Sequence, residues 1–197
     1  MPKQRITKEM VVNAAFELAR QGGMEQVIVK SIAQKIGCSV QPIYSYCNNM
    51  DGLRNDVCDK VRNFIQGYIA SHIDKNDLFR STGQAYIQLA KDEPHILKIF
   101  ILQERKNIAS LEDLYQAEAN PQVARSISEK LKISLESAKQ LHLNMLIYTI
   151  GIGTIFSVST PGISTDEIYF QQEQAYHAFL KAALERKESE YENSSNI

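Results

Sequence analysis

The stretch that decides the fold is residues 30–46, KSIAQKIGCSVQPIYSY. Its apolar spacing predicts two short helices joined by a tight turn at Gly37, because glycine tolerates the left-handed conformation of such a turn. Ala33 is small enough for the two helices to cross closely there. Ser39 is suited to cap the second helix, and Pro42 falls in its first turn, where a missing N–H costs little.

Two short helices in this arrangement are typical of a helix-turn-helix, whose second helix enters the major groove of DNA. The exposed side chains suit that role, since the hydroxyls of Ser39, Tyr44 and Tyr46 can bond phosphate oxygens. The amide of Gln41 can contact a base edge, while Val40 and Pro42 can touch a thymine methyl. Helix–glycine–helix segments also occur in helical proteins that bind no DNA. The spacing alone therefore leaves both interpretations open.

The charge distribution favours an anionic partner for the N-terminal part. Before residue 49 there are six Lys and Arg against three Asp and Glu, a net charge of +3. The whole chain carries −1, so the remaining 149 residues carry −4. A basic end joined to an acidic body is expected when only the first part contacts nucleic acid.

Helical periodicity continues through the rest of the chain, and no stretch shows the alternating pattern of a strand in a hairpin. Thr7 caps a first helix that ends at Gly22, and Asn49 caps a long helix that reaches about His72. The fold class is therefore predicted to be all-α. Further helices are expected at about 77–91, 94–105, 110–117, 121–131, 134–158 and 165–188.

Residues 7–64 resemble the N-terminal domain of the TetR family of bacterial regulators. The shared pattern is VVNAAFELARQGG, then SIAQKIGCSVQPIYSY, then Asp51 and Leu53. The chain departs from the family at Ile28, where Thr or Ser often caps the second helix, at Cys47, usually an aromatic, and at Met50, commonly a phosphate-contacting lysine. Basic residues of the N-terminal arm, Lys3, Arg5 and Lys8, can compensate. The resemblance places these residues at DNA-facing positions: Lys30, Ser39, Gln41, Pro42, Tyr44 and Tyr46.

The resemblance also implies how the chain is divided. Residues 1–48 would form a three-helix DNA-binding domain, and 49–190 a larger helical bundle for ligand binding and dimerisation. Residues 191–197 are polar, and we predict a disordered tail. An internal pocket would be lined by aromatic or polar residues on apolar helix faces, although such residues are more often plain core than ligand contacts. The candidates are Phe64, Tyr68, Tyr86, Phe100, Tyr115, His142, Met145 and Tyr148.

A two-fold dimer interface is expected on the last two long helices. Glycines inside a helix cost about 1 kcal/mol each relative to alanine, and they usually mark the close approach of another backbone. Gly151 and Gly153 are such positions, and a symmetry-related helix is one explanation for them; burial within one subunit is the other. The interface candidates are Gly151, Ile152, Ile155, Tyr169, Tyr176 and Phe179.

These patterns favour a cytoplasmic homodimeric repressor that binds a double-stranded DNA operator and is released by an unknown small-molecule effector. Two alternatives remain, control by a protein partner, which predicts a filled core, and oxidation of Cys38, Cys47 or Cys58. No enzyme is expected, because no Ser-His-Asp signature, P-loop or H-E-x-x-H motif is found. No cofactor, metal site or membrane span is expected either, because Cys and His lack ligand spacing and the most apolar stretch, 145–158, is too short.

Overall fold

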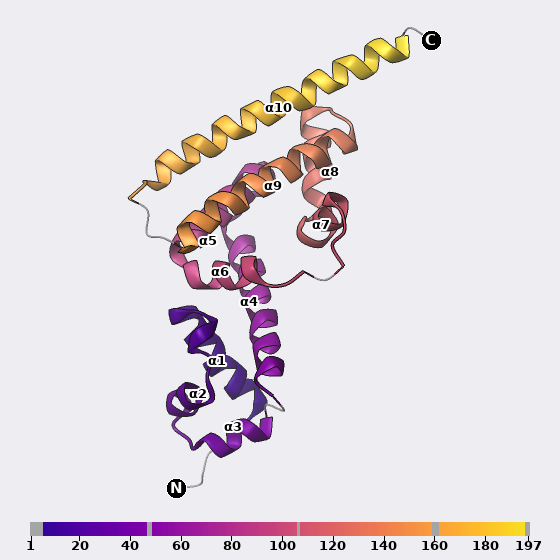
Figure 1. The fold of residues 1–197 in the computed structure, drawn as a ribbon. Coiled ribbons are helices and arrows are strands. Elements are labelled where there is room, and N and C mark those ends of the chain that lie inside the picture. Colours follow the sequence, from indigo (N-terminus) through magenta and orange to yellow (C-terminus); the bar gives the residue numbers. More distant parts are fainter. Residues whose placement is uncertain (1–5, 47–48, 106, 159–161, 196–197) are drawn as a thin grey trace.

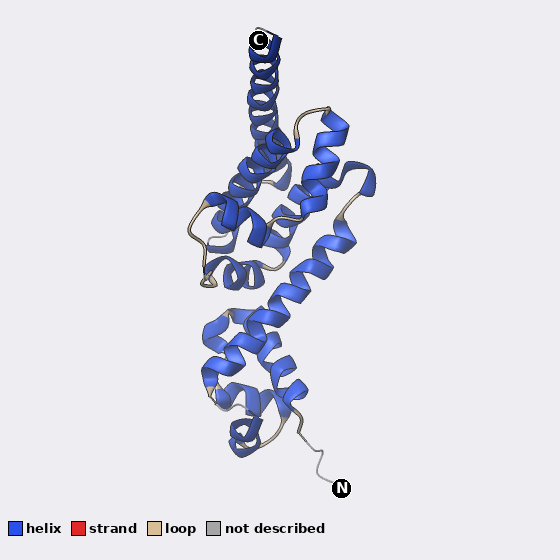
Figure 2. Ribbon diagram, turned by 90° about the vertical axis from the view of Figure 1, so that its right-hand side faces the viewer, coloured by secondary structure: helices blue, strands red, loops and turns tan. Residues whose placement is uncertain are grey.

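The computed structural model describes residues 6–46, 49–105, 107–158 and 162–195, and all their regular secondary structure is helical (Figure 2). The all-α prediction is therefore confirmed. Short 3-10 turns at Met24–Gln26 and Lys75–Asp77 separate some of the helices. The α-helices are α1 (Lys8–Gly22), α2 (Val29–Ile36), α3 (Val40–Tyr46), α4 (Met50–His72), α5 (Leu78–Asp92), α6 (Pro94–Leu102), α7 (Leu111–Glu118), α8 (Pro121–Leu131), α9 (Leu135–Val158) and α10 (Thr165–Ser195).

The first three helices form a small unit at one end of the molecule (Figure 1). Thr7 caps α1, because its side-chain oxygen accepts a hydrogen bond from the Met10 amide at 3.2 Å. Gly23 ends the helix with φ at +89°, a conformation that glycine adopts without strain. The helices close around fully buried apolar side chains, among them Ile32 of α2 and Ile43 of α3.

Helix α4 connects this unit to the body of the protein (Figure 1). Leu53 and Val57, near its N-terminal end, belong to the same apolar core as α1, α2 and α3. The core continues without a break into α5 and α6, through residues such as Ile87 and Ile96. A domain boundary at residue 48 would therefore cut through a continuous core. Helix α4 contributes side chains to the core of the N-terminal unit and to that of the body.

Helix α9 is the centre of the body, and α5, α6, α8 and α10 all pack against it. Helix α10 lies outermost and runs on past the body (Figure 1). It continues to Ser195, into the stretch 191–197 for which the composition predicted disorder. Residues 185–192 are rich in Glu and Lys, which are good helix formers. Residues 196–197 lie outside the described residues. No helix in the described ranges is both long and apolar enough to cross a membrane.

Candidate DNA-binding surface and ligand cavity

Residues 29–46 form a helix-turn-helix. Gly37 closes α2 in the left-handed conformation, with φ at +78° and ψ at +36°. The amides of Gly37 and Cys38 both donate to the Ala33 carbonyl oxygen, at 2.9 and 3.0 Å. A Cβ added at Gly37 would meet nothing within 4 Å, so glycine is needed there for backbone conformation rather than for space. Ala33 is buried where α2 and α3 pack together.

Most of the residues expected to face DNA are exposed on α3 and on the segment before it. Lys30, Ser39 and Gln41 are exposed, and Val40 and Tyr44 are large apolar or aromatic side chains that are 43% and 60% exposed. An isolated aromatic ring with this exposure gains little from the core and is available to a partner. The exposed set therefore forms one surface of hydroxyl, amide and apolar groups on α3, with Lys30 at the start of α2.

Pro42 and Tyr46 are only half-buried, and Tyr46 packs against the core. Met50, where the family commonly has lysine, also packs inward against that core. Lys8 forms an ion pair with Asp56 of α4 at 2.8 Å, so it joins α1 to α4. Residues Lys3, Arg5 and Cys47 lie outside the described residues.

A cavity of about 740 Å³ lies in the body. Its wall is built from α4 to α10 and the connections beside them. This volume is in the range typical of sites for drug-sized molecules. The apolar part of the wall includes Ile65, Ile69, Leu78, Phe79, Phe100 and Met145.

Two buried polar groups also reach the cavity, on one face of α9. His142 is 7% exposed, and its Nδ1 lies 2.9 Å from the hydroxyl of Tyr115. Burial lowers the pKa of His142 to about 4, so the ring is neutral near pH 7. Two turns further along, Thr149 accepts a hydrogen bond from the Gln172 amide of α10 at 3.3 Å. A Cβ at Gly83 would lie 2.6 Å from that amide nitrogen, so the absence of a side chain there makes room for Gln172.

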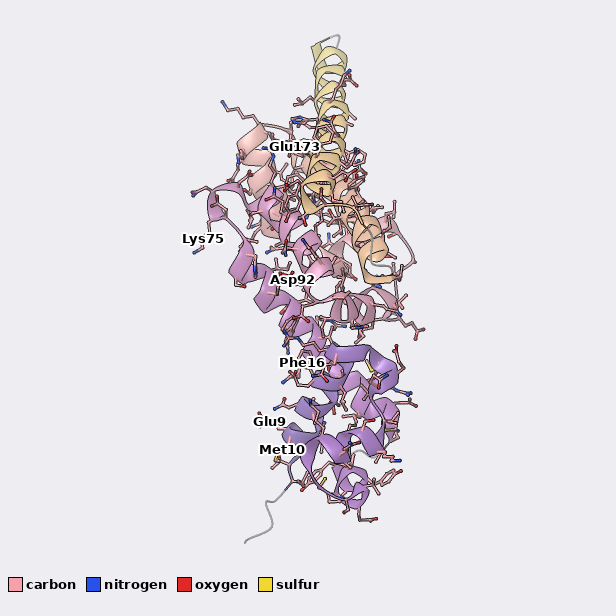
Figure 3. The ribbon with its side chains drawn as sticks, turned by 90° about the vertical axis from the view of Figure 1, so that its left-hand side faces the viewer. Glu9, Met10, Phe16, Lys75, Asp92 and Glu173 are labelled. Carbon is pink, nitrogen blue, oxygen red and sulfur yellow. The ribbon has the colours of Figure 1, made fainter. Side chains whose placement is uncertain are left out.

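Four of the charged groups on the wall form two ion pairs. Arg105 Nε contacts a carboxylate oxygen of Glu118 at 2.5 Å, and Arg80 contacts Glu173 at 2.8 Å. Figure 3 shows the labelled Glu173 on α10 in the body, far from Phe16 of α1. Three arginines and three glutamates line the cavity, so their formal charges cancel.

A search of solved structures finds a transcriptional regulator from Rhodococcus sp. Rha1 that resembles this chain with a TM-score of 0.58. The two proteins share a fold. The match covers 90% of this chain and 97% of the other chain. The sequence identity is 12%, so the similarity is one of fold only. No protein-family model matches the sequence, and a search of curated proteins finds no match.

Half of the eight predicted pocket residues line the cavity, namely Tyr86, Phe100, His142 and Met145. The other four do not, so these assignments are corrected. Phe64 packs between α1 and α4, with its ring 5.7 Å from that of Phe16, and Arg20 lies over it. Tyr68 donates its hydroxyl proton to Asp92 at 2.7 Å. Tyr115 lies behind His142, and Tyr148 is half-buried on α9 away from the wall.

The paired charges of the wall were missed by the sequence analysis. In the sequence these four residues look like ordinary charged residues of solvent-exposed helix faces. Each ion pair also joins residues that are distant in the sequence, Arg105 with Glu118 and Arg80 with Glu173. The only available signal was a charged residue on an otherwise apolar helix face, which is weak. Among the described residues no cluster of His, Cys, Asp and Glu could hold a metal ion.

The six interface candidates fall into three groups. Gly151 and Ile155 are exposed on α9 and can meet a partner. Ile152, Tyr169 and Phe179 are partly buried against the subunit's own core. Tyr176 was placed wrongly: it is 8% exposed and lines the cavity, with its ring 5.6 Å from Phe79. Further exposed apolar residues on these helices are Ile147, Val158 and Phe170.

Proposed function

We propose that this protein is a homodimeric, DNA-binding transcriptional regulator of the TetR type that works in the cytoplasm and is released from its operator by a small molecule. The observation that carries the proposal is the helix-turn-helix over residues 29–46, whose second helix is covered on one side by the core and exposed on the other. The regulator fold of the Rhodococcus protein supports it.

The dimer is supported by an apolar face that α9 leaves exposed. Ile147, Gly151, Ile155 and Val158 follow one another at three- and four-residue spacing, so they lie on one face of the helix. Phe170 of the neighbouring α10 is 59% exposed. An isologous contact between two such faces would bury them and would present two α3 helices to half-sites one DNA turn apart.

The cavity favours control by a small molecule. Control by a protein partner alone predicts a core without such a cavity. Helix α4 lines the cavity through Ile65 and Ile69, and the same helix begins at Met50, shortly after α3 ends. Arg20 of α1 also binds Glu93, between α5 and α6, through two hydrogen bonds from its Nε at 3.0 and 2.9 Å. A ligand that favours one position of α4 would therefore shift the α3 helices relative to the half-sites.

Oxidation of a cysteine is less favoured. Burial raises the pKa of the Cys58 thiol, which lowers the fraction of reactive thiolate. Cys38 is half-buried beside the α2–α3 turn and has no disulfide partner among the described residues. DNA binding that is lost on mild peroxide treatment and restored by a thiol reductant would revive this alternative.

The proposal is tested by selecting binding sites from a random double-stranded DNA library with the purified protein. A regulator of this kind should enrich an inverted repeat whose half-sites lie about 10 base pairs apart, or a multiple of that distance. Tyr44→Ala serves as the comparison, because the ring is 60% exposed and contributes little to the core. The variant should fold normally and enrich the repeat poorly. Failure of the wild-type protein to enrich any sequence would refute DNA-binding regulation.

A further inference from the structure

The chemistry of the effector can be narrowed from the inner wall of the cavity. His142 lies there among aromatic rings, with Phe79 at 5.8 Å and Tyr115 at 5.4 Å between ring centroids, both edge-on. Tyr115 itself is 3% exposed and is not part of the wall. The two side chains therefore form a buried pair of which only the imidazole faces the cavity.

The direction of the hydrogen bond in this pair sets which imidazole nitrogen carries the proton. Burial raises the pKa of Tyr115 to about 12, so its hydroxyl keeps its proton. A buried hydroxyl proton without an acceptor is costly, and Nδ1 of His142 is the acceptor found for it among the described residues. Tyr115 therefore donates to Nδ1. A neutral imidazole has one N–H, so Nε2 of His142 must carry it.

This Nε2–H group is the donor that His142 can offer to a ligand in the cavity. It has no hydrogen-bond partner within the described part of the chain. Yet every fully covered side-chain nitrogen or oxygen atom in that part has one. Nε2 is consequently not fully covered, and the cavity is the open space that His142 lines. Beside the hydrogen-bonded Thr149–Gln172 pair, the wall thus offers one unpaired N–H donor next to the ring of Phe79.

The charges of the wall argue against an ionic ligand. Arg105 is already paired with Glu118, and Arg80 with Glu173. His142 is neutral and adds no charge. An anion at Arg105 or Arg80, or a cation at Glu118 or Glu173, would have to break one of these pairs and leave its partner unpaired. Arg62 is 48% exposed and donates to Gln103 at 2.8 Å, and Glu104 is exposed, so both belong to the outer part of the wall.

We propose that the effector is an uncharged, largely apolar and aromatic small molecule whose oxygen atom, as in a ketone or an ester, accepts a hydrogen bond from Nε2 of His142. Tyr115 is the positioning residue that holds the imidazole with this nitrogen as donor. The inference rests on the proposed function, in which the cavity is the effector site.

The test uses three probes of matched shape: 2-acetylnaphthalene, which carries an acceptor oxygen, 2-isopropenylnaphthalene, in which CH₂ replaces that oxygen, and the anion 2-naphthoate. Calorimetric titration of the full-length protein measures the affinity for each. The ketone should bind more tightly than the naphthoate. Its affinity relative to the alkene should fall about five- to tenfold in His142→Phe, the factor that corresponds to one neutral hydrogen bond.

Two further variants keep the test decisive. His72→Phe replaces an exposed histidine of α4 outside the cavity and should leave the ketone-to-alkene ratio unchanged. Tyr115→Phe leaves His142 in place but frees Nδ1, and it should lower the same ratio even if His142→Phe folds poorly. Three outcomes would overturn the proposal. The naphthoate could bind most tightly, no probe could bind, or the ketone-to-alkene affinity ratio could stay the same in both His142→Phe and Tyr115→Phe. DNA affinity is measured separately, so a regulator that binds DNA but prefers another ligand is distinguished from a protein that binds no DNA.

Discussion

Acid should destabilise this protein through His142. The pKa of its imidazole falls from an ordinary value of 6.5 to about 4 because the ring is buried. Between pH 6.5 and pH 4, His142 therefore binds a proton in the unfolded chain but not in the folded protein. Proton binding favours the unfolded chain, so the stability that is present above pH 6.5 is lost as the pH falls toward 4. At 1.36 kcal/mol per pH unit, the loss from this residue is about 2 kcal/mol at pH 5 and about 3 kcal/mol at pH 4.

The measurement is urea unfolding, followed by circular dichroism, at pH values from 7 to 4. His142→Asn is the matched variant, because it keeps a polar group for Tyr115 but does not titrate in this range. Carboxylates titrate in both proteins, so their effect cancels in the difference between wild type and variant. The free-energy advantage of the wild type should shrink by about 2 kcal/mol between pH 7 and pH 5. A difference that stays constant with pH would show that His142 is solvated and would refute this account of the cavity wall.

Three further predictions follow from single contacts. Gly37→Ala should lower the free energy of unfolding by about 1 kcal/mol, measured by urea titration, because φ is +78° and no clash adds to the conformational cost. An unchanged midpoint would mean that the turn is not left-handed. Glu93→Gln should cost about 1 kcal/mol in the same assay, since Arg20 is 39% exposed and solvent screens the pair; a loss above 3 kcal/mol would contradict that screening. Gln41→Ala should relax the preference for particular bases, whereas Tyr44→Ala should weaken binding to all DNA alike, as measured by competition with single-base variants of the selected site. Equal, small effects of both would argue against the docking of α3.

The helix-turn-helix was predictable because its determinants are local. Gly37 closes a turn, Ala33 permits a close crossing and Ile43 faces inward, and all three lie within eleven residues of one another. Periodicity and caps also placed α8 and the start of α10 correctly. The end of α10 was missed, because a polar composition with strong helix formers fits both a tail and a solvated helix.

The cavity was predictable only in part. Periodicity shows that a residue lies on an inward face, but it does not tell whether that face meets a cavity or a neighbouring side chain. Tyr68 and His142 look alike in this respect, yet one bonds Asp92 outside the cavity and the other lines it. Tyr176 was misassigned for a related reason, since α10 has both an inner and an outer face and a single sequence does not say which one a partner covers.

The most direct test of the central claim is fluorescence anisotropy of the purified protein on DNA from upstream of its own coding region, at several salt concentrations. A specific regulator should bind this DNA at least about a thousandfold more tightly than a scrambled sequence, with an affinity that falls steeply as salt rises. Equal, weak binding to both DNAs, together with failure to enrich a site from the random library, would contradict the account.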